Sequence, residues 1–183
     1  MDPCHDTKLP DIDALFIGGG FPETHMNELE ANKLLRSEIK TAIDNGLPTY
    51  AECGGLMYLG KTLVLKENTY PMAGILPVEF GFSKKPQGHG YTRLKIAADN
   101  PFFETGLEIK GHEFHYSKVL RWNDDTGRLV FEMLRGNGIK DGLDGASYKN
   151  VLATYTHIHA LGNPEWAEAM VRNAAQFQKT RPA

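Results

Sequence analysis

A cysteine followed by two glycines is the part of this sequence best suited to chemistry. Cys53 comes directly after the short strand expected over 47–52, with the small residues Ala51 and Gly55 two positions before and after it. Small residues there are the steric requirement of a nucleophile elbow, a tight strand-to-helix turn that lifts the central side chain above a sheet. A helix beginning at Gly54 would point its N–H groups at the sulfur, which favours the thiolate. The Gly54 N–H could also hold an oxyanion formed when the sulfur attacks a carbonyl.

A thiolate nucleophile also needs a base. The pattern over 151–155 predicts a strand, and His157 and His159 follow it. The carboxyl ends of parallel strands line the ligand crevice of such sheets, and Cys53 stands at a strand end too, so the groups could meet there. The alternatives are an inert buried cysteine and hydrogen-bonded structural histidines. Cys4, near the N-terminus, is assigned no chemistry.

The three glycines at 18–20 form a loop that is not typical of a phosphate cradle. The sequence lacks G-x-x-x-x-G-K-[ST], and G-x-G-x-x-G fails because Glu23 stands where the third glycine is needed. Glycines that expose backbone N–H groups at a strand end suit a second oxyanion donor. This role fits acyl transfer by a cysteine and a histidine better than nucleotide binding.

The elements that must position these residues follow an α/β rhythm. The pattern predicts a buried strand over 12–17, two helices or one bent helix up to Asn45, with Asn32 as the cap of the second, and a strand over 47–52. Further short strands are expected at 63–65, 75–80, 91–96, 113–120, 128–134 and 151–155, and a last helix begins at Pro164. The predicted fold is a mostly parallel open sheet with helices on both faces plus antiparallel additions.

The length and composition of the chain exclude several classes of protein. A length of 183 residues predicts one domain over 1–183. The net charge of −3 offers no electrostatic footprint for nucleic acid, and two cysteines are too few for a disulfide framework. We see no signal peptide and no apolar run long enough to span a membrane, so we expect a cytoplasmic protein.

Four ordered segments together resemble the class I (triad-type) glutamine amidotransferase domain, whose fold is flavodoxin-like. They are GGGFPE at 18–23, AECGGLMYL at 51–59, GHEFHYS at 111–117 and YTHIH at 155–159. The nearest branch is that of the cobyrinic acid a,c-diamide synthases and related tetrapyrrole-amidating enzymes. The resemblance covers nearly the whole chain, and the order of the four segments makes it specific.

The resemblance implies hydrolysis of glutamine to glutamate and ammonia. Cys53 would attack the side-chain amide, and His157 would act as base and then as proton donor to the leaving ammonia. Gly54 and the loop of Gly19 and Gly20 would supply oxyanion N–H groups.

The resemblance also implies how glutamine is held and which partners are needed. The strand that carries Phe114 and His115 would help to hold glutamine. No metal and no cofactor are expected in this domain. ATP and Mg²⁺ would belong to a synthetase domain or subunit that activates tetrapyrrole carboxylates, and the chain could also form a homo-oligomer.

The sequence departs from the family pattern in several places. Many members carry Glu two residues after the histidine, where this chain has His159, so a Cys–His dyad with the third member absent or replaced is expected. Met57 stands where many have Gln. No P-loop is present, and the first strands of the family fold are expected to be missing, which would leave an uncovered sheet edge. A fragment, a split-gene subunit or a protomer completed by a partner would have these features.

Two other readings use the same residues. A metal could bind His112, His115, His157 and His159, but His-x-x-His on a strand places its two imidazoles on opposite faces. A non-catalytic interaction module would also keep the fold. Cys53, its glycines and His157 argue against that reading, because a binding module has no use for a thiol on a strained turn.

Overall fold

The chain folds into two sheets and four α-helices over residues 1–123 and 128–181, which are the residues that this computed structural model describes. The larger sheet has the order β1-β2-β11-β10-β9-β6-β7, and the smaller has the order β4-β3-β5-β8. The strands of the larger sheet are β1 (Leu15–Ile17), β2 (Thr49–Glu52), β6 (Gly88–Ile96), β7 (Glu108–His115), β9 (Arg128–Arg135), β10 (Leu143–Tyr148) and β11 (Val151–Thr154). Those of the smaller sheet are β3 (Thr62–Leu65), β4 (Asn68–Pro71), β5 (Val78–Phe82) and β8 (Ser117–Trp122). The helices are α1 (Met26–Ala31), α2 (Lys33–Asp44), α3 (Gly54–Leu59) and α4 (Pro164–Thr180), with a 3₁₀ turn at Pro22–Thr24.

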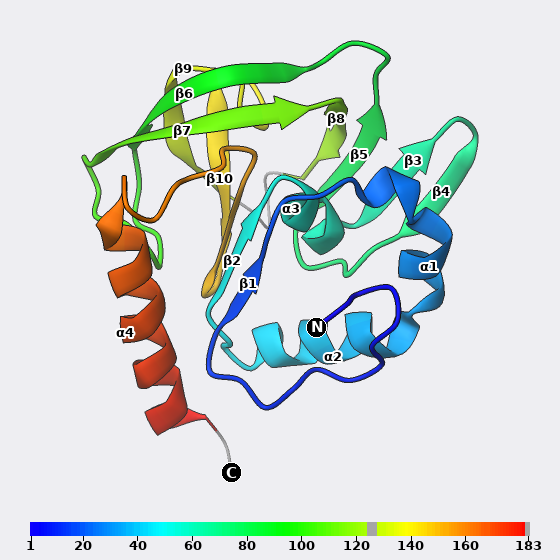
Figure 1. Ribbon diagram of the computed structural model, residues 1–183, viewed down its shortest axis with the longest axis horizontal. Coiled ribbons are helices and arrows are strands. Elements are labelled where there is room, and N and C mark those ends of the chain that lie inside the picture. Colours follow the sequence, from blue (N-terminus) through cyan, green and yellow to red (C-terminus); the bar gives the residue numbers. More distant parts are fainter. Residues whose placement is uncertain (124–127, 182–183) are drawn as a thin grey trace.

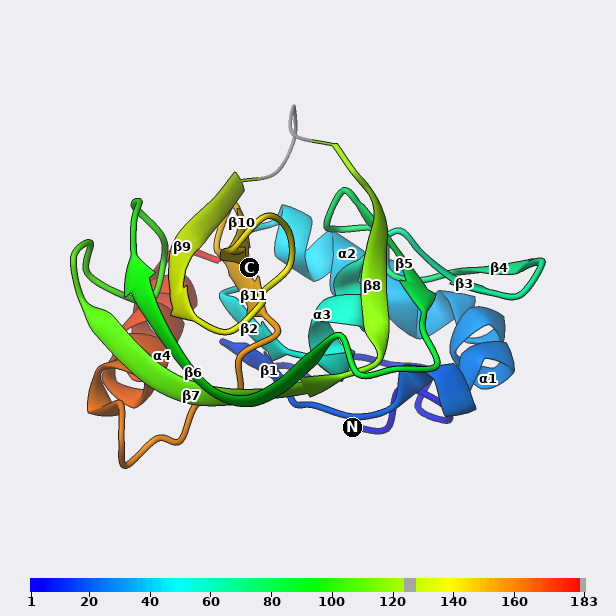
Figure 2. The same cartoon turned by 90° about the horizontal axis from the view of Figure 1, so that it is seen from above.

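The parallel part of the larger sheet carries the cysteine turn. β1 and β11 both pair in parallel with β2, and α1 and α2 form the crossover from β1 to β2. The pairs β11–β10, β10–β9, β9–β6 and β6–β7 are antiparallel. The long strands β6 and β7 curve across one side of the molecule (Figure 2). The predicted α/β class with antiparallel additions is confirmed, but the expectation of a mostly parallel sheet is corrected to a mixed one, because four of these six strand pairs are antiparallel.

Helices cover both faces of the parallel strands (Figure 1). Successive side chains of a strand point to opposite faces, and Ala51 packs in the core cluster that contains the buried side chains of α2 and α3. Tyr50 points the other way, where the Trp166 ring of α4 packs at 5.6 Å from its ring. Trp166 also lies 5.4 Å from the ring of Phe16 in β1, an edge strand among the described residues.

Several boundaries differ from the sequence-based expectation for identifiable reasons. The expected strand at 113–120 is two strands, because the chain leaves the larger sheet after His115 and joins β5 of the smaller sheet from Ser117. The helical stretch is two helices, and Asn32 caps the second as predicted, accepting a hydrogen bond from the Leu35 N–H at 3.3 Å. Within the described residues, no helix is both long and apolar enough to cross a bilayer.

Candidate active site

The turn at Cys53 has the strained geometry of a nucleophile elbow. Cys53 lies between β2 and α3 with φ 45° and ψ −98°, a region that non-glycine residues rarely adopt. A Cβ atom on Gly54 would lie 2.6 Å from the Gly20 carbonyl oxygen, and one on Gly55 would collide with the Ile17 carbonyl. The close approach of these backbones explains why the turn needs glycines and confirms the elbow predicted from the sequence.

His157 lies beside this turn and is fixed from two sides. β11 ends at Thr154, and the His157 backbone then pairs with His112 in an isolated antiparallel bridge, with N···O distances of 2.9 and 2.7 Å. The ring Nδ1 of His157 lies 3.1 Å from the Glu52 Oε2, so it can donate a hydrogen bond to that carboxylate. The other Glu52 oxygen accepts a hydrogen bond from the Ile158 N–H at 3.1 Å.

The charge state of His157 follows from its two partners. Its hydrogen bond with Cys53 and then its hydrogen bond with Glu52 raise the pKa of His157 to about 10, against the opposing effect of burial. The imidazole is therefore protonated at neutral pH. A protonated imidazole beside a cysteine sulfur is the arrangement that stabilises a thiolate nucleophile.

Glu52 is the functional residue that the sequence analysis missed. The third member was expected to be absent or replaced, and the structure places the Glu52 carboxylate at the His157 ring, where it can orient the imidazole as the acid of a catalytic triad orients its base. It comes from the residue before the nucleophile, not from a position after the histidine. The sequence did contain a signal, because Glu52 ends the strand expected over 47–52. The structure shows that this strand is fully buried, and a buried carboxylate needs a hydrogen-bonding partner.

The predicted oxyanion glycines gather around Cys53 and His157. A Cβ atom on Gly19 would collide with the His157 ring, so the glycine loop lies directly against the imidazole. Gly20 contacts Gly54 backbone to backbone on the other side. Two separate loops thus bring these three glycines close to Cys53 and His157, and the binding of an oxyanion by their N–H groups stays a prediction.

The two residues predicted to hold glutamine occupy different surroundings. The Phe114 carbonyl oxygen lies 3.8 Å from the Cys53 Sγ, so its backbone borders the site. His115 is buried, with its ring stacked at 3.6 Å on the ring of Tyr155 and its Nδ1 donating to the Ser117 carbonyl at 2.9 Å. Their contact with glutamine stays a prediction.

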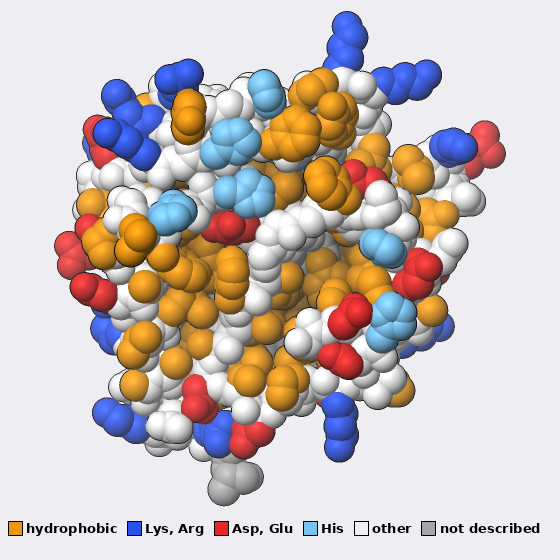
Figure 3. Space-filling view, viewed as in Figure 1, with side chains coloured by type: hydrophobic (Ala, Val, Ile, Leu, Met, Phe, Trp, Pro, Cys, Tyr) orange, Lys and Arg blue, Asp and Glu red, His pale blue; other side chains and the backbone are white. Residues whose placement is uncertain are grey.

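The remaining histidines lie in different surroundings from His157. His159 is exposed, and its carbonyl accepts hydrogen bonds from the turn that leads into α4. Among residues 1–123 and 128–181, no group of three or more His, Cys, Asp or Glu side chains is placed to hold a metal ion. Figure 3 shows histidine side chains grouped on the upper part of one face, beside a broad area of hydrophobic side chains.

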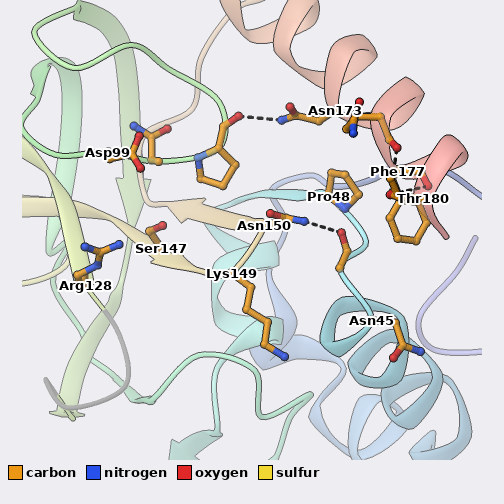
Figure 4. Close-up of a pocket in the computed structure, with 14 residues that line it drawn as sticks. Asn45, Pro48, Asp99, Arg128, Ser147, Lys149, Asn150, Asn173, Phe177 and Thr180 are labelled. Carbon is orange, nitrogen blue, oxygen red and sulfur yellow. Dashed lines mark hydrogen bonds between the residues drawn. The ribbon is translucent and has the colours of Figure 1, made fainter. Parts of the chain in front are cut away.

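A hollow lies at the end of the parallel strands opposite to Cys53 and His157. This pocket of about 550 Å³ is lined by Pro48 and Asn150, which precede β2 and β11, and by polar side chains of α4 (Figure 4). Cys53 and His157 follow the other ends of the same strands. No thiol or imidazole is among the described residues that line this pocket, so it offers no comparable nucleophile.

Comparisons with known proteins identify the family and the fold of the chain. Residues 1–165 match the family model of the CobB/CobQ-like glutamine amidotransferase domain. The chain is 42% identical over 177 residues to the cobyrinate a,c-diamide synthase of Methanothermobacter thermautotrophicus, a match that covers 97% of this chain and 38% of that protein. It is 42% identical over 167 residues to the synthase of the same name from Magnetococcus marinus, with 91% and 36% covered. The chain therefore spans under two fifths of the length of these curated relatives.

Solved structures show the same fold. A crystal structure of a glutamine amidotransferase matches with a TM-score of 0.66 and 17% identity, over 91% of this chain and 82% of that one. The structure of PurLQS from Thermotoga maritima matches with a TM-score of 0.66 and 19% identity, over 95% and 83%. These structures share the fold of this chain, and the matched family model and the curated relatives show that the chain belongs to the CobB/CobQ-like glutamine amidotransferase domain family.

Proposed function

We propose that this chain is the glutaminase part of an amidating enzyme and that it releases ammonia from the side chain of glutamine. The observation that carries the proposal is the set of groups at one strand end: Cys53 lies on a strained turn beside His157, and the His157 Nδ1 lies 3.1 Å from the Glu52 carboxylate. Nucleophile, acid–base group and orienting carboxylate are the three parts that acyl transfer needs.

The first half of the reaction uses the resting charge state. The Cys53 sulfur attacks the amide carbon of glutamine, and the N–H groups of Gly54 and the 19–20 loop hold the resulting oxyanion. When the tetrahedral intermediate collapses, the C–N bond breaks and protonated His157 gives its proton to the leaving ammonia. The product is a glutamyl thioester on Cys53.

The second half regenerates the thiolate. His157, now neutral, takes a proton from water while that water attacks the thioester carbon. Collapse of the second oxyanion breaks the C–S bond, so glutamate leaves and Cys53 returns to its starting state. Glu52 stays hydrogen-bonded to Nδ1 throughout and keeps Nε2 available for each proton transfer.

The destination of the ammonia is proposed from the relatives. Their name describes amidation of cobyrinate at its a and c carboxylates. We place this chain beside a synthetase domain or subunit that uses ATP and Mg²⁺ to activate such tetrapyrrole carboxylates, in the cytoplasm. Assembly as a homo-oligomer is compatible with this arrangement.

Affinity labelling tests the glutaminase proposal directly. 6-Diazo-5-oxonorleucine resembles glutamine and alkylates a nucleophile that attacks it, and peptide mass spectrometry then locates the label. We expect label on Cys53, competed by glutamine, and none on Cys4, whose thiol pKa is raised by burial. Cys53→Ser should abolish labelling, and Cys4→Ser is the matched control that should leave it intact.

The same experiment separates the proposal from a non-catalytic module. Such a module would bind without chemistry, so neither thiol would be labelled and no glutamate would form from glutamine, even with a synthetase present. Label on Cys4 in place of Cys53 would also overturn the proposed mechanism.

A further inference from the structure

Asp144 is a fully buried carboxylate that lies outside the contacts of the proposed triad. It is the second residue of β10 and is 0% exposed. Its Oδ1 accepts hydrogen bonds from the Gly145 N–H at 2.8 Å and the Tyr155 N–H at 3.1 Å. Its Oδ2 accepts from the Thr154 hydroxyl at 2.7 Å and the Thr156 N–H at 3.2 Å.

Three of these donors belong to the three residues that immediately precede His157. β11 ends at Thr154, so the regular sheet ladder no longer holds the chain where it turns toward the active site. The Asp144 side chain takes over as acceptor for that stretch, and the His112 bridge and Glu52 hold the chain from His157 onward. Two carboxylates thus hold the histidine. Asp144 binds the segment 154–156 that leads into it, and Glu52 binds its ring.

The bonding pattern fits a carboxylate better than an amide. An ionised Asp offers only acceptor sites, and all four groups that reach it can donate. Burial raises the pKa of Asp144, while the hydrogen bonds from Thr154, Gly145, Tyr155 and Thr156 act in the opposite direction. An Asn side chain would point an NH₂ group at either Oδ position, where a backbone N–H already faces it. At Oδ1 the NH₂ group would take the place of the oxygen that accepts from the Gly145 and Tyr155 N–H groups, and at Oδ2 it would leave the Thr156 N–H with the Thr154 hydroxyl as its acceptor.

We propose that Asp144 is a positioning residue for His157: it fixes the 154–156 segment so that the imidazole lies within hydrogen-bonding reach of both Cys53 and Glu52. This inference rests on the proposed function, in which His157 is the acid–base group. It adds to the active site a residue from β10 that touches neither glutamine nor the sulfur.

The experiment measures the His157 ring itself, so it does not depend on turnover. NMR titration of ring-labelled protein gives the His157 pKa, which in the wild type is about 10 because of Cys53 and Glu52. We expect Asp144→Asn to move this pKa down toward the ordinary value of 6.5 as those hydrogen bonds loosen. Where turnover is measurable, kcat should fall about 100-fold with KM little changed, as for a misplaced catalytic group.

Asn100 offers a matched control. Its side chain also makes four hydrogen bonds within one loop, accepting from the Phe102 and Phe103 N–H groups and donating to the Ala98 and Phe103 carbonyls. None of these partners contacts the 154–156 segment in the described hydrogen bonds. Asn100→Asp makes the reverse acid–amide swap, so it should lower the unfolding midpoint and leave the His157 pKa unchanged.

A milder pair keeps the test available if Asp144→Asn fails to fold. Thr154→Val removes the hydroxyl donor to Oδ2 and the acceptor for the Thr156 N–H at 3.0 Å, whereas Thr154→Ser keeps both. The proposal expects a lowered His157 pKa in the valine variant and recovery in the serine variant. A wild-type pKa in Asp144→Asn or Thr154→Val, or an equal shift in Asn100→Asp, overturns it. Absence of glutamine hydrolysis with a shifted pKa would overturn the proposed function alone.

Discussion

The Glu52 carboxylate and the His157 imidazole lie 3.1 Å apart, although 105 residues separate them in the sequence. Glu52 directly precedes Cys53 at the end of β2, so one strand end supplies both the nucleophile and the group that orients the base. The second oxygen of the same carboxylate holds the Ile158 N–H. Movement of β2 would therefore carry sulfur and carboxylate together, which keeps the spacing between Cys53 and His157 constant.

Replacing Glu52 by Gln tests this relationship. The Gln oxygen can still accept from Ile158, but its NH₂ group would face Nδ1, so His157 would lose its acceptor and turn to the wrong tautomer. We expect the His157 pKa to fall and kcat for glutamine hydrolysis to drop roughly 10²- to 10⁴-fold. Steady-state kinetics and NMR titration measure the two effects.

Glu108→Gln is the control for loss of one surface carboxylate. Glu108 has a side chain that is 54% exposed, and it lies 3.5 Å from the Arg93 Nε. Such exposed pairs contribute little, so activity and the His157 pKa should stay at wild-type values. Full activity in Glu52→Gln would show that Cys53 and His157 act without a third member.

The stability of the protein should depend on pH through His157. Its pKa is raised from 6.5 in the unfolded chain to about 10 in the folded protein, so its stabilising contribution is fully present below about pH 6.5. The contribution is lost as the pH rises through about 10. Urea unfolding at several pH values should give the largest difference between wild type and His157→Gln near pH 6 and the smallest above about pH 10.

Cys53→Ala provides an internal check on the cause. The hydrogen bond with Cys53 is the largest contribution to the raised His157 pKa. Removing the sulfur should therefore reduce how much the free energy of unfolding changes between about pH 6 and about pH 10. A stability difference between wild type and His157→Gln that is constant across this pH range would contradict the raised pKa.

Many of the helices and strands could be predicted, because the residue patterns that start and end them lie within a few positions of each other in the sequence. Apolar runs closed by glycines marked β1 and β2, and Asn32 and Pro164 marked helix starts, which are local capping effects. The change of sheet between His115 and Ser117 could not be predicted in the same way. Both segments read as strand, and only their partners β6 and β5, which lie elsewhere in the sequence, separate them.

The part of the site that lies within one short loop could be predicted from the sequence. The contacts between residues far apart in the sequence could not. The glycines after Cys53 predicted the nucleophile elbow, because the turn leaves no space for larger side chains at these positions. Glu52 and Asp144 left weaker signals, because a buried acid shows its role only through partners such as His157 and Thr156. Their positions relative to those partners are set by the pairing of β2 and β10 with β11.

Two neighbouring leucines test the buried face of α2. Leu35 is 0% exposed in the core cluster, whereas Leu34 is 66% exposed. Leu35→Ala should lower the free energy of unfolding by about 2–5 kcal/mol, because it removes buried methyl groups and leaves a cavity. Leu34→Ala should change it by less than about 0.5 kcal/mol. Equal losses in urea unfolding would mean that α2 faces the core differently.

Substitutions at Gly18 and Gly19 test whether the 18–20 loop needs a glycine to leave space for the His157 ring or needs glycines for flexibility. A Cβ atom on Gly19 would collide with the His157 ring, whereas one on Gly18 would meet nothing closer than the Phe16 ring at 3.9 Å. Neither glycine has a positive φ, so alanine strains neither backbone. Gly19→Ala should therefore push the imidazole aside and lower kcat about 100-fold, while Gly18→Ala should leave kcat near the wild-type value. The rate of Cys53 alkylation by iodoacetamide, measured beside turnover, shows whether the displaced imidazole still activates the sulfur. Equal losses of kcat in the two variants would point to loop flexibility as the requirement, because only the residue at 19 can reach the ring.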